Sequence, residues 1–224
     1  MSLYSSRFLF HLAMRLLYSG HFDERYAAIA DQIPLGATVV EVCAGDGYLY
    51  LKHLRRKPVE YLGLDISPQL VRWAQRHGVK ARVFDVWQDT LPAGDVIVIQ
   101  ASLYQFAPRA GWIIERMLAA ARRKVIVAEP IHNLSASPNP ILAALGRRLT
   151  APDTSAAGPY SGRRFDYRSL SELFHSFETF QASFVAAGGK EMVGIFTGQA
   201  RNRASQDRRG EGRDVYHSIQ SREL

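Results

Sequence analysis

The chain has 224 residues, of which 47% are hydrophobic and 22% are charged, so it suits one globular domain with a substantial core. No apolar run reaches the roughly 20 residues that cross a bilayer, so we expect no transmembrane segment. The single cysteine, Cys43, excludes an internal disulfide and fits a reducing compartment, which favours a cytoplasmic protein whose oligomeric state the sequence leaves open.

The formal net charge of +7 raises the question of an anionic partner such as nucleic acid. Basic runs at 55–57 and 122–124 each end an expected helix. We interpret them as cations at the carbonyl ends of those helices, where the helix dipole favours positive charge. A polynucleotide site more often shows a basic face with interleaved aromatics, whereas the basic doublets here are dispersed. The pattern therefore leaves nucleic acid open as a partner without favouring it.

The first segment, 1–22, is expected to form a helix that packs as a lid over the domain. It has apolar residues around Arg7 and Arg15 but no small-residue cleavage site, which argues against a signal peptide. Two cations are few for a helix that lies on a membrane surface.

Between residues 38 and 129, short runs rich in Val, Ile and Leu alternate with amphipathic stretches. This pattern predicts a doubly wound α/β fold, with a mostly parallel, Rossmann-like sheet covered by helices on both faces. Strands are expected at 38–43, 61–64, 81–84, 96–100 and 125–129, and helices at 48–56, 68–77 and 109–121. Ser67 and Pro68 mark the start of the second helix, because serine is a good N-cap and proline suits the first helical position.

The regular alternation stops after residue 129. Residues 131–164 hold four prolines and several serines and are expected to form an inserted cap. A helix at 166–177 and two strands at 179–185 and 191–197 follow, and the glycine-bearing link 186–190 predicts an antiparallel hairpin that completes a seven-stranded sheet. We therefore expect a domain at 23–198 and a polar, disordered tail at 199–224.

A glycine turn follows the first strand. The sequence Glu41-Val-Cys43-Ala-Gly45-Asp-Gly47 joins a hydrophobic strand to the next helix, and the glycines let a ligand approach the main chain closely. In a doubly wound sheet, ligands collect at the carboxyl ends of such strands. By itself, the turn is also compatible with a purely structural connection between strand and helix.

Acidic residues follow the next two strands. Asp65 comes eighteen residues after Gly47, where a carboxylate can accept both hydroxyls of a ribose. Asp85 follows the third strand, where its side chain or the backbone of Val86 could meet an adenine amino group. The pattern predicts an adenosine site, although Asp85 is also compatible with a solvated loop residue.

An NAD site is the obvious competitor, because the same geometry binds dinucleotides. Its glycine fingerprint needs a small sixth residue, but counting from Gly45 gives Tyr50. Glu41 would repel a pyrophosphate, whereas it suits a cofactor that carries an amino group and a sulfonium. These residues favour S-adenosylmethionine over NAD.

The stretch Glu41 to Gly47 resembles the acidic, glycine-rich loop of class I S-adenosylmethionine-dependent methyltransferases, with Cys43 in place of the first glycine. The resemblance spans about 23–197, including the terminal hairpin. It implies that Asp65 holds the ribose, that adenine lies around Asp85 and Val86, and that Ile66 also belongs to the cofactor site. In this family an N-terminal segment often closes over the active site, which makes Tyr18, His21 and Tyr26 candidate contacts.

The resemblance also implies that Gln100 and Ser102, after the fourth strand, lie near the methionine portion of the cofactor and the transferred methyl. His132, which follows the fifth strand, is our candidate general base for a hydroxyl acceptor, although a structural histidine fits equally. The remaining histidines lack metal-ligand spacing, so we predict no metal. A methyltransferase also works without a base when its acceptor is already nucleophilic.

The implied reaction is methyl transfer from S-adenosylmethionine to an oxygen or nitrogen of a small-molecule acceptor, leaving S-adenosylhomocysteine. No added binding module for a macromolecule is recognisable. RNA or protein methylation and a noncatalytic S-adenosylmethionine-binding protein stay open as alternatives, and an NAD-dependent oxidoreductase is less favoured.

Overall fold

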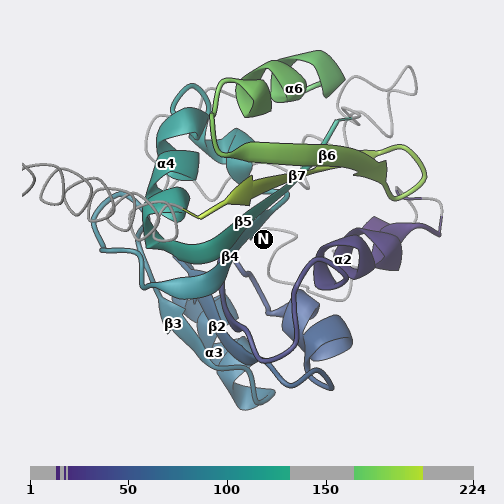
Figure 1. Ribbon diagram of the computed structural model, residues 1–224. Helices are drawn as coiled ribbons and strands as arrows, with labels where there is room; N and C mark the ends of the chain where they lie inside the picture. Colours follow the sequence, from purple (N-terminus) through teal and green to yellow (C-terminus); the bar gives the residue numbers. More distant parts are fainter. Residues whose placement is uncertain (1–13, 16–17, 19, 132–163, 199–224) are drawn as a thin grey trace, which may run out of the picture.

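The computed structural model describes residues 14, 15, 18, 20–131 and 164–198 (Figure 1). Seven strands form one sheet in the order β3-β2-β1-β4-β5-β7-β6. The strands are β1 (Thr38–Val42), β2 (Glu60–Asp65), β3 (Ala81–Val83), β4 (Gly94–Gln100), β5 (Ala121–Pro130), β6 (Phe180–Ala186) and β7 (Glu191–Thr197). The first five pair in parallel, and β7 runs antiparallel between β5 and β6. The predicted sheet and its terminal hairpin are confirmed.

Helices cover both faces of this sheet. They are α2 (Phe22–Ala30), the π-helix η2 (Tyr50–Leu54), α3 (Pro68–Arg76), the 3-10 helix η3 (Leu103–Phe106), α4 (Ala110–Ala120) and α6 (Tyr167–His175). One hydrophobic core joins the sheet to α4 and α6, and a second joins its other face to α2, η2 and α3. Successive β4 side chains enter opposite cores, which explains why the strand is a continuous apolar run.

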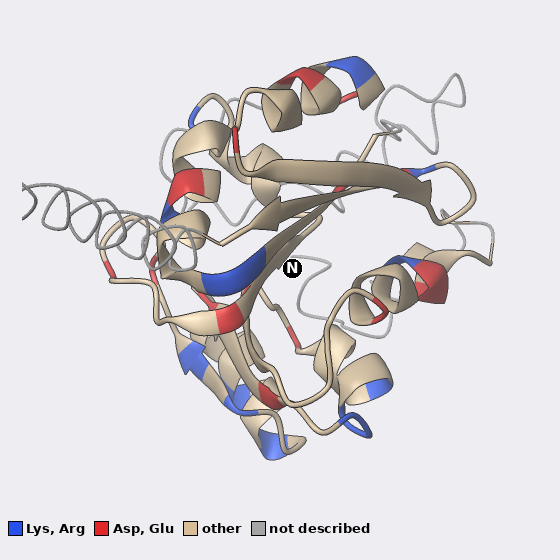
Figure 2. Cartoon of the chain, in the orientation of Figure 1, with Lys and Arg blue, Asp and Glu red and all other residues tan. Residues whose placement is uncertain are grey.

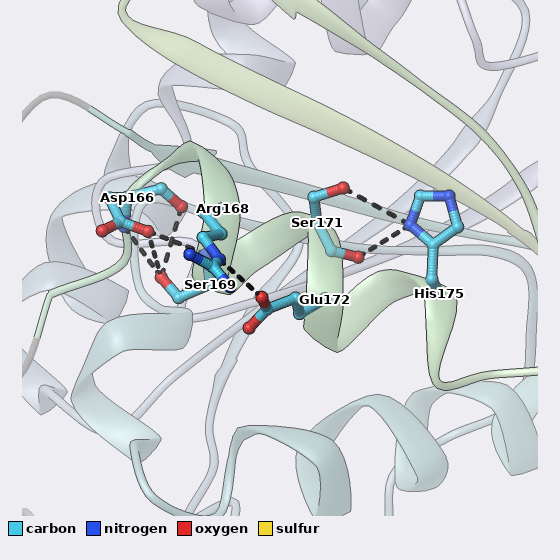
Figure 3. A network of polar contacts seen from close by, with 6 residues as sticks. All are labelled: Asp166, Arg168, Ser169, Ser171, Glu172 and His175. Atoms are coloured by element: carbon cyan, nitrogen blue, oxygen red, sulfur yellow. Dashed lines mark hydrogen bonds and ion pairs between the residues drawn. The ribbon is translucent and has the colours of Figure 1, made fainter.

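Two helix starts follow from their first residues. The Ser67 hydroxyl accepts a hydrogen bond from the Leu70 amide at 3.4 Å, with Pro68 at the first helical position of α3. At α6 the Asp166 carboxylate accepts from the Ser169 amide at 2.7 Å, and the Ser169 hydroxyl accepts from the Asp166 amide (Figure 3). These caps satisfy amide groups that a helix leaves without internal partners.

The prediction that the basic run 122–124 ends a helix is wrong. Helix α4 ends at Ala120, and β5 begins at once with Ala121, four residues earlier than expected. Ala121 has an extended backbone and pairs with Gly94, so hydrogen bonds to β4 replace another helical turn. The Arg122 guanidinium instead binds Asp95 at 3.0 Å, and the Lys124 ammonium donates to the Gln32 carbonyl at 2.8 Å.

The basic run 55–57 follows η2, but its lysine serves a different helix. The Lys57 ammonium donates to the carbonyls of Ala30 and Ile33 at 2.5 and 3.2 Å, at and just beyond the carboxyl end of α2. The predicted interaction of a cation with helix carbonyls is therefore present, but it joins Lys57 to α2 and not to the helix that precedes it. The predicted helix 48–56 is present, with π-helical hydrogen bonding over Tyr50–Leu54.

The sequence analysis missed helix α2. It has no side-chain cap at its start and only a weak amphipathic pattern, because Arg25 occupies one of its buried positions beside Phe22 and Ile29. A charged residue at a core position hides the apolar stripe by which surface helices are recognised. This arginine becomes important at the candidate site.

Most of the predicted lid, cap and tail lies outside the described residues, so these domain boundaries stay predictions. The flanks of 131–164 are nevertheless fixed. The Ile131 amide donates to the Lys190 carbonyl at 3.0 Å, and the Arg164 guanidinium lies 3.6 Å from the centre of the Tyr104 ring. Both ends of the segment therefore lie where β4 and β5 end and β7 begins.

Candidate functional site

The glycine turn after β1 has an unusual backbone. Cys43, Gly45 and Gly47 all have positive φ angles, of 57°, 58° and 72°. A β-carbon added to Gly47 would lie 3.0 Å from the side chain of Val79, so this position also needs a small residue for packing. Cys43 adopts a conformation that glycine tolerates far better, which fits its place at the first glycine position of the loop.

Asp65 ties the end of β2 to this turn. Its carboxylate accepts the Gly45 amide at 2.8 Å on one oxygen and the Ser67 amide at 2.9 Å on the other. Burial raises the pKa of Asp65, while these two amide bonds oppose that shift. The neighbouring Ile66 is 38% exposed, so a carboxylate and an apolar side chain lie together at the carboxyl edge of the sheet.

Glu41 lies beneath the turn and is only 4% exposed. Burial raises its pKa to about 8, although a short hydrogen bond from the Tyr61 hydroxyl opposes the shift and the nearby carboxylates of Asp46 and Asp65 add to it. Tyr50 stacks on Tyr61 with ring centres 4.9 Å apart. Tyr50, at the sixth position of the glycine motif, therefore serves as an aromatic packing residue.

Asp85 lies two residues beyond the end of β3 and is engaged within its own turn. Its carboxylate accepts the Trp87 amide at 2.9 Å and the Gln88 side-chain amide at 2.7 Å. Val86 is buried, and its carbonyl accepts a short hydrogen bond from Arg116. The structure thus gives the Asp85 carboxylate a turn-forming role and places the backbone of Val86 beside it.

Gln100 and Ser102 lie at the end of β4, 7% and 8% exposed. The intervening Ala101 has a positive φ of 48°, another strained position at this edge. Burial raises the pKa of the Cys43 thiol, and the Ser102 side chain lies near enough to oppose that shift, which brings the end of β4 beside the turn after β1. The predicted cofactor residues on β1, β2 and β4 are therefore connected by contacts.

A buried ion cluster that the sequence analysis missed adjoins these residues. The Arg25 guanidinium makes a short ion pair with Glu191, the first residue of β7. The Gln100 amide donates to the other Glu191 oxygen at 3.3 Å, and the Tyr18 hydroxyl lies 3.5 Å from the carboxylate. Arg25 and Glu191 are 2% and 0% exposed.

Two polar atoms in this cluster have no hydrogen-bond partner among the described residues. They are Nη2 of Arg25 and Oε1 of Gln100, a donor and an acceptor on either side of the same Glu191 carboxylate. Buried polar groups are normally paired, because desolvating one without compensation costs roughly 1 to 3 kcal/mol. The arrangement is complementary to a ligand that offers one acceptor and one donor.

Glu129 adds a second buried carboxylate near the end of β5 and is 1% exposed. Burial raises its pKa to about 8, against the hydrogen bonds from the amides of Leu103 and Tyr104 and the attraction of Arg164. These amides start η3, so Glu129 fixes the segment that follows β4.

The sequence did contain a signal for these residues. The adenosine site was predicted from acids at the ends of the first three strands. Glu129 ends the predicted fifth strand and Glu191 begins the predicted last strand, and both lie at the same edge of the sheet. The same rule, applied to the fifth strand and to the hairpin, points to both residues.

The proposed base His132 lies outside the described residues, so its role stays a prediction. Among the residues that the structure describes, no group of three His, Cys, Asp or Glu side chains could hold a metal ion. None of the helices in the described ranges has the length and apolar character that a bilayer crossing requires.

No family model and no curated protein matches the sequence. Solved structures do match. Magnesium protoporphyrin IX methyltransferase from Synechocystis PCC 6803, solved with S-adenosylhomocysteine, is 14% identical with a TM-score of 0.56, covering 83% of this chain and 85% of that one.

Two larger proteins are also similar. An O-methyltransferase family 2 protein from Planctomyces limnophilus in complex with apigenin is 14% identical, with a TM-score of 0.58 over 87% of this chain and 62% of that one. Human N-acetylserotonin methyltransferase in complex with S-adenosylmethionine is 16% identical, with a TM-score of 0.58 over 87% of this chain and 57% of that one. The chain therefore has the fold of class I S-adenosylmethionine-dependent methyltransferases.

Proposed function

We propose that the protein is an S-adenosylmethionine-dependent methyltransferase that acts on an oxygen or nitrogen of a small-molecule acceptor. The observation that carries this proposal is the contact between the Asp65 carboxylate and the Gly45 amide, which joins a ribose-binding group to a glycine turn at the carboxyl edge. Similar folds solved with S-adenosylhomocysteine and S-adenosylmethionine support the choice of cofactor.

The nucleoside half of the cofactor fits the residues around Asp65. Each carboxylate oxygen accepts one amide and keeps further acceptor capacity for a ribose hydroxyl. Ile66 offers an exposed apolar surface for the adenine ring, and the turn at Asp85 and Val86 follows β3, whose last residue pairs with Asp65. Because the Asp85 carboxylate is engaged in its turn, we assign adenine recognition to the Val86 backbone.

The amino-acid half fits the buried cluster. An α-amino acid carries a carboxylate that accepts hydrogen bonds and an ammonium that donates them. Arg25 Nη2 and Gln100 Oε1 supply the matching donor and acceptor. Glu41 and Ser102, on the neighbouring strand ends, complete a cradle whose acidic character suits a cationic donor.

The acceptor would lie beyond β4 and β5, enclosed by the predicted cap. Both flanks of 131–164 are fixed at this edge, by the Ile131 amide and by Arg164 on Tyr104. A segment that leaves and returns beside the site suits the enclosure of a small molecule. The apigenin complex of a similar fold is consistent with an acceptor of that size.

The proposed methyl transfer requires little acid or base catalysis by the protein. S-adenosylmethionine supplies a methyl group activated by its sulfonium, so alignment of donor and acceptor provides much of the rate. Glu129 contributes by holding η3 in place through the Leu103 amide. His132 stays our candidate for removing a proton from a hydroxyl acceptor.

Calorimetry with S-adenosylmethionine, S-adenosylhomocysteine and NAD tests the proposal. We expect both sulfur cofactors to bind and NAD not to bind. Asp65→Ala should weaken S-adenosylhomocysteine about 10- to 100-fold, the loss of a hydrogen bond to a charged group worth about 1.5 to 3 kcal/mol. Asp31→Ala, at an exposed aspartate just after α2, is the matched control and should leave affinity unchanged.

Tight NAD binding without either sulfur cofactor would reject the proposal in favour of an oxidoreductase. Cofactor binding without turnover of phenol, amine and carboxylic acid acceptors would support the noncatalytic alternative.

A further inference from the structure

The positive charge of the molecule is concentrated in one stretch. Residues 52–82 contain eight Lys and Arg against two acids, so they carry a net charge of +6 out of the +7 of the whole chain. This stretch comprises η2, β2, α3 and β3, which are consecutive elements at one end of the sheet. The charge is therefore a local property of this end.

The fold places the basic residues of this stretch at one end of the molecule. Figure 2 shows lysines and arginines gathered at the lower end of the molecule, over α3, β3 and the connection from η2 to β2. The Arg55 guanidinium lies 3.9 Å from where a β-carbon of Gly78 would be, which joins the end of η2 to the end of α3. We define the basic face by its seven exposed members, Lys52, Arg55, Arg56, Arg72, Arg76, Lys80 and Arg82.

Several cations elsewhere in the described residues form ion pairs with acids. Arg25 pairs with Glu191, Arg122 with Asp95, and Arg168 with Glu172. No member of the basic face forms an ion pair with a residue in the described ranges. Of the two acids within the stretch, Asp65 is turned to the glycine loop, which leaves Glu60 as the exposed one.

An aromatic pair lies within the same surface. Trp73 of α3 and His77, the residue that follows the helix, stack with ring centres 3.5 Å apart, and the exposed Arg72 and Arg76 precede them in the sequence. Cations interleaved with aromatic rings are typical of surfaces that bind single-stranded nucleic acid, where phosphates meet the charges and bases stack. Ile66 is the exposed large hydrophobic of this stretch and Val83 lies just after it, so apolar exposure is small, which disfavours insertion into a membrane.

We propose that the basic face binds single-stranded nucleic acid through its phosphate backbone. The inference goes beyond the proposed function, because the face runs along α3 and β3 and not over the glycine turn. Helix α3 has nine residues, so its basic end lies about 13 Å from the carboxyl edge where the helix begins. A bound strand would be tethered beside the catalytic edge without occupying the cofactor site.

Fluorescence anisotropy with a labelled 20-nucleotide RNA and the matched DNA tests the proposal on the full chain. If about five phosphates are neutralised, raising the salt from 50 to 200 mM should weaken binding about 100-fold or more. Arg76→Glu should weaken binding at least tenfold, and Arg76→Lys should retain it. Arg168→Glu, on the distant α6, is the matched charge reversal and should change affinity less than twofold (Figure 3).

Equal losses in Arg76→Glu and Arg168→Glu would overturn the proposal, because the affinity would then follow net charge and not this face. Salt-insensitive binding, absence of binding, or binding to phosphatidylserine vesicles but not to either oligonucleotide would overturn it as well. S-adenosylhomocysteine affinity, measured on the same Arg76→Glu protein, should stay unchanged and so separates this result from the proposed function.

Discussion

The two edges of the sheet shift the pKa of their acidic side chains in opposite directions. At the amino edge, Asp95 on β4 accepts hydrogen bonds from the backbone amide and hydroxyl of Thr38 at 2.9 and 3.0 Å and from Arg122 at 3.0 Å. These bonds lower its pKa to about 2. At the carboxyl edge, burial raises the pKa of Glu41 and of Glu129 to about 8.

The amino edge of the sheet therefore contributes to stability, whereas the carboxyl edge has the features of a binding site. The amino-edge network connects the starts of β1, β4 and β5, and it stabilises the folded state by satisfying a charge. The carboxyl edge instead holds buried acids, two polar atoms that lack partners among the described residues, and non-glycine residues with positive φ. Such costs are tolerated where a ligand is bound, because the ligand can supply the missing partners.

Breaking an ion pair at each edge should give the largest contrast. Arg25→Met leaves Glu191 buried without its cation and should lower the free energy of unfolding by about 3 to 5 kcal/mol. Arg122→Met removes a half-exposed pair and should cost about 1 kcal/mol or less. Urea denaturation followed by circular dichroism measures both.

A double variant sharpens this result. Arg25→Met combined with Glu191→Leu removes both charges, so it should regain most of the lost stability without regaining cofactor affinity. A double variant as unstable as Arg25→Met would show that the cost comes from packing and not from the unpaired charge.

The two edges should also respond to pH in opposite directions. Asp95 has a lowered folded pKa, so its stabilising effect is present above pH 4 and is lost as the pH falls to about 2. Glu129 has a raised folded pKa, so its contribution to stability is fully present below pH 4.5 and is lost as the pH rises to about 8.

Urea melts between pH 2 and pH 9 give the free energy of unfolding against pH, and neutral variants test its fall at low pH (the acid limb) and at high pH (the alkaline limb). Asp95→Asn should flatten the acid limb. Glu129→Gln should flatten the alkaline limb, by up to about 1.4 kcal/mol per pH unit. An alkaline limb that is unchanged in Glu129→Gln would assign the pH dependence to other groups such as Glu41.

The smallest effect concerns the backbone at the glycine turn. Because Cys43 has a φ of 57°, Cys43→Gly should be about 1 kcal/mol more stable than Cys43→Ala. Within α3, Ala74→Gly should instead lower stability by about 1 kcal/mol. Thermal melts compare the variants, and an alanine at 43 that matches glycine would mean that the turn relaxes out of its left-handed conformation.

Much of the fold follows from local pattern. The alternation of apolar runs and helices predicted every strand, and Ser67 and Pro68 fixed the start of α3. The meeting of Asp65 with the glycine turn was also predictable, because parallel neighbouring strands bring their carboxyl ends to one edge. Strand limits were less secure, as β5 shows, since a strand begins where a neighbouring strand offers hydrogen bonds.

The sequence by itself determined the repeating βα order and the acids that end its strands, because these depend on the period of side chains along the chain. Only the tertiary structure decided that Arg25 meets Glu191 across 166 positions of sequence, and that Gln100 donates to the same carboxylate. Such contacts depend on how loops close and which strands become neighbours. That information is carried by the packing of the whole sheet, and no window of residues contains it.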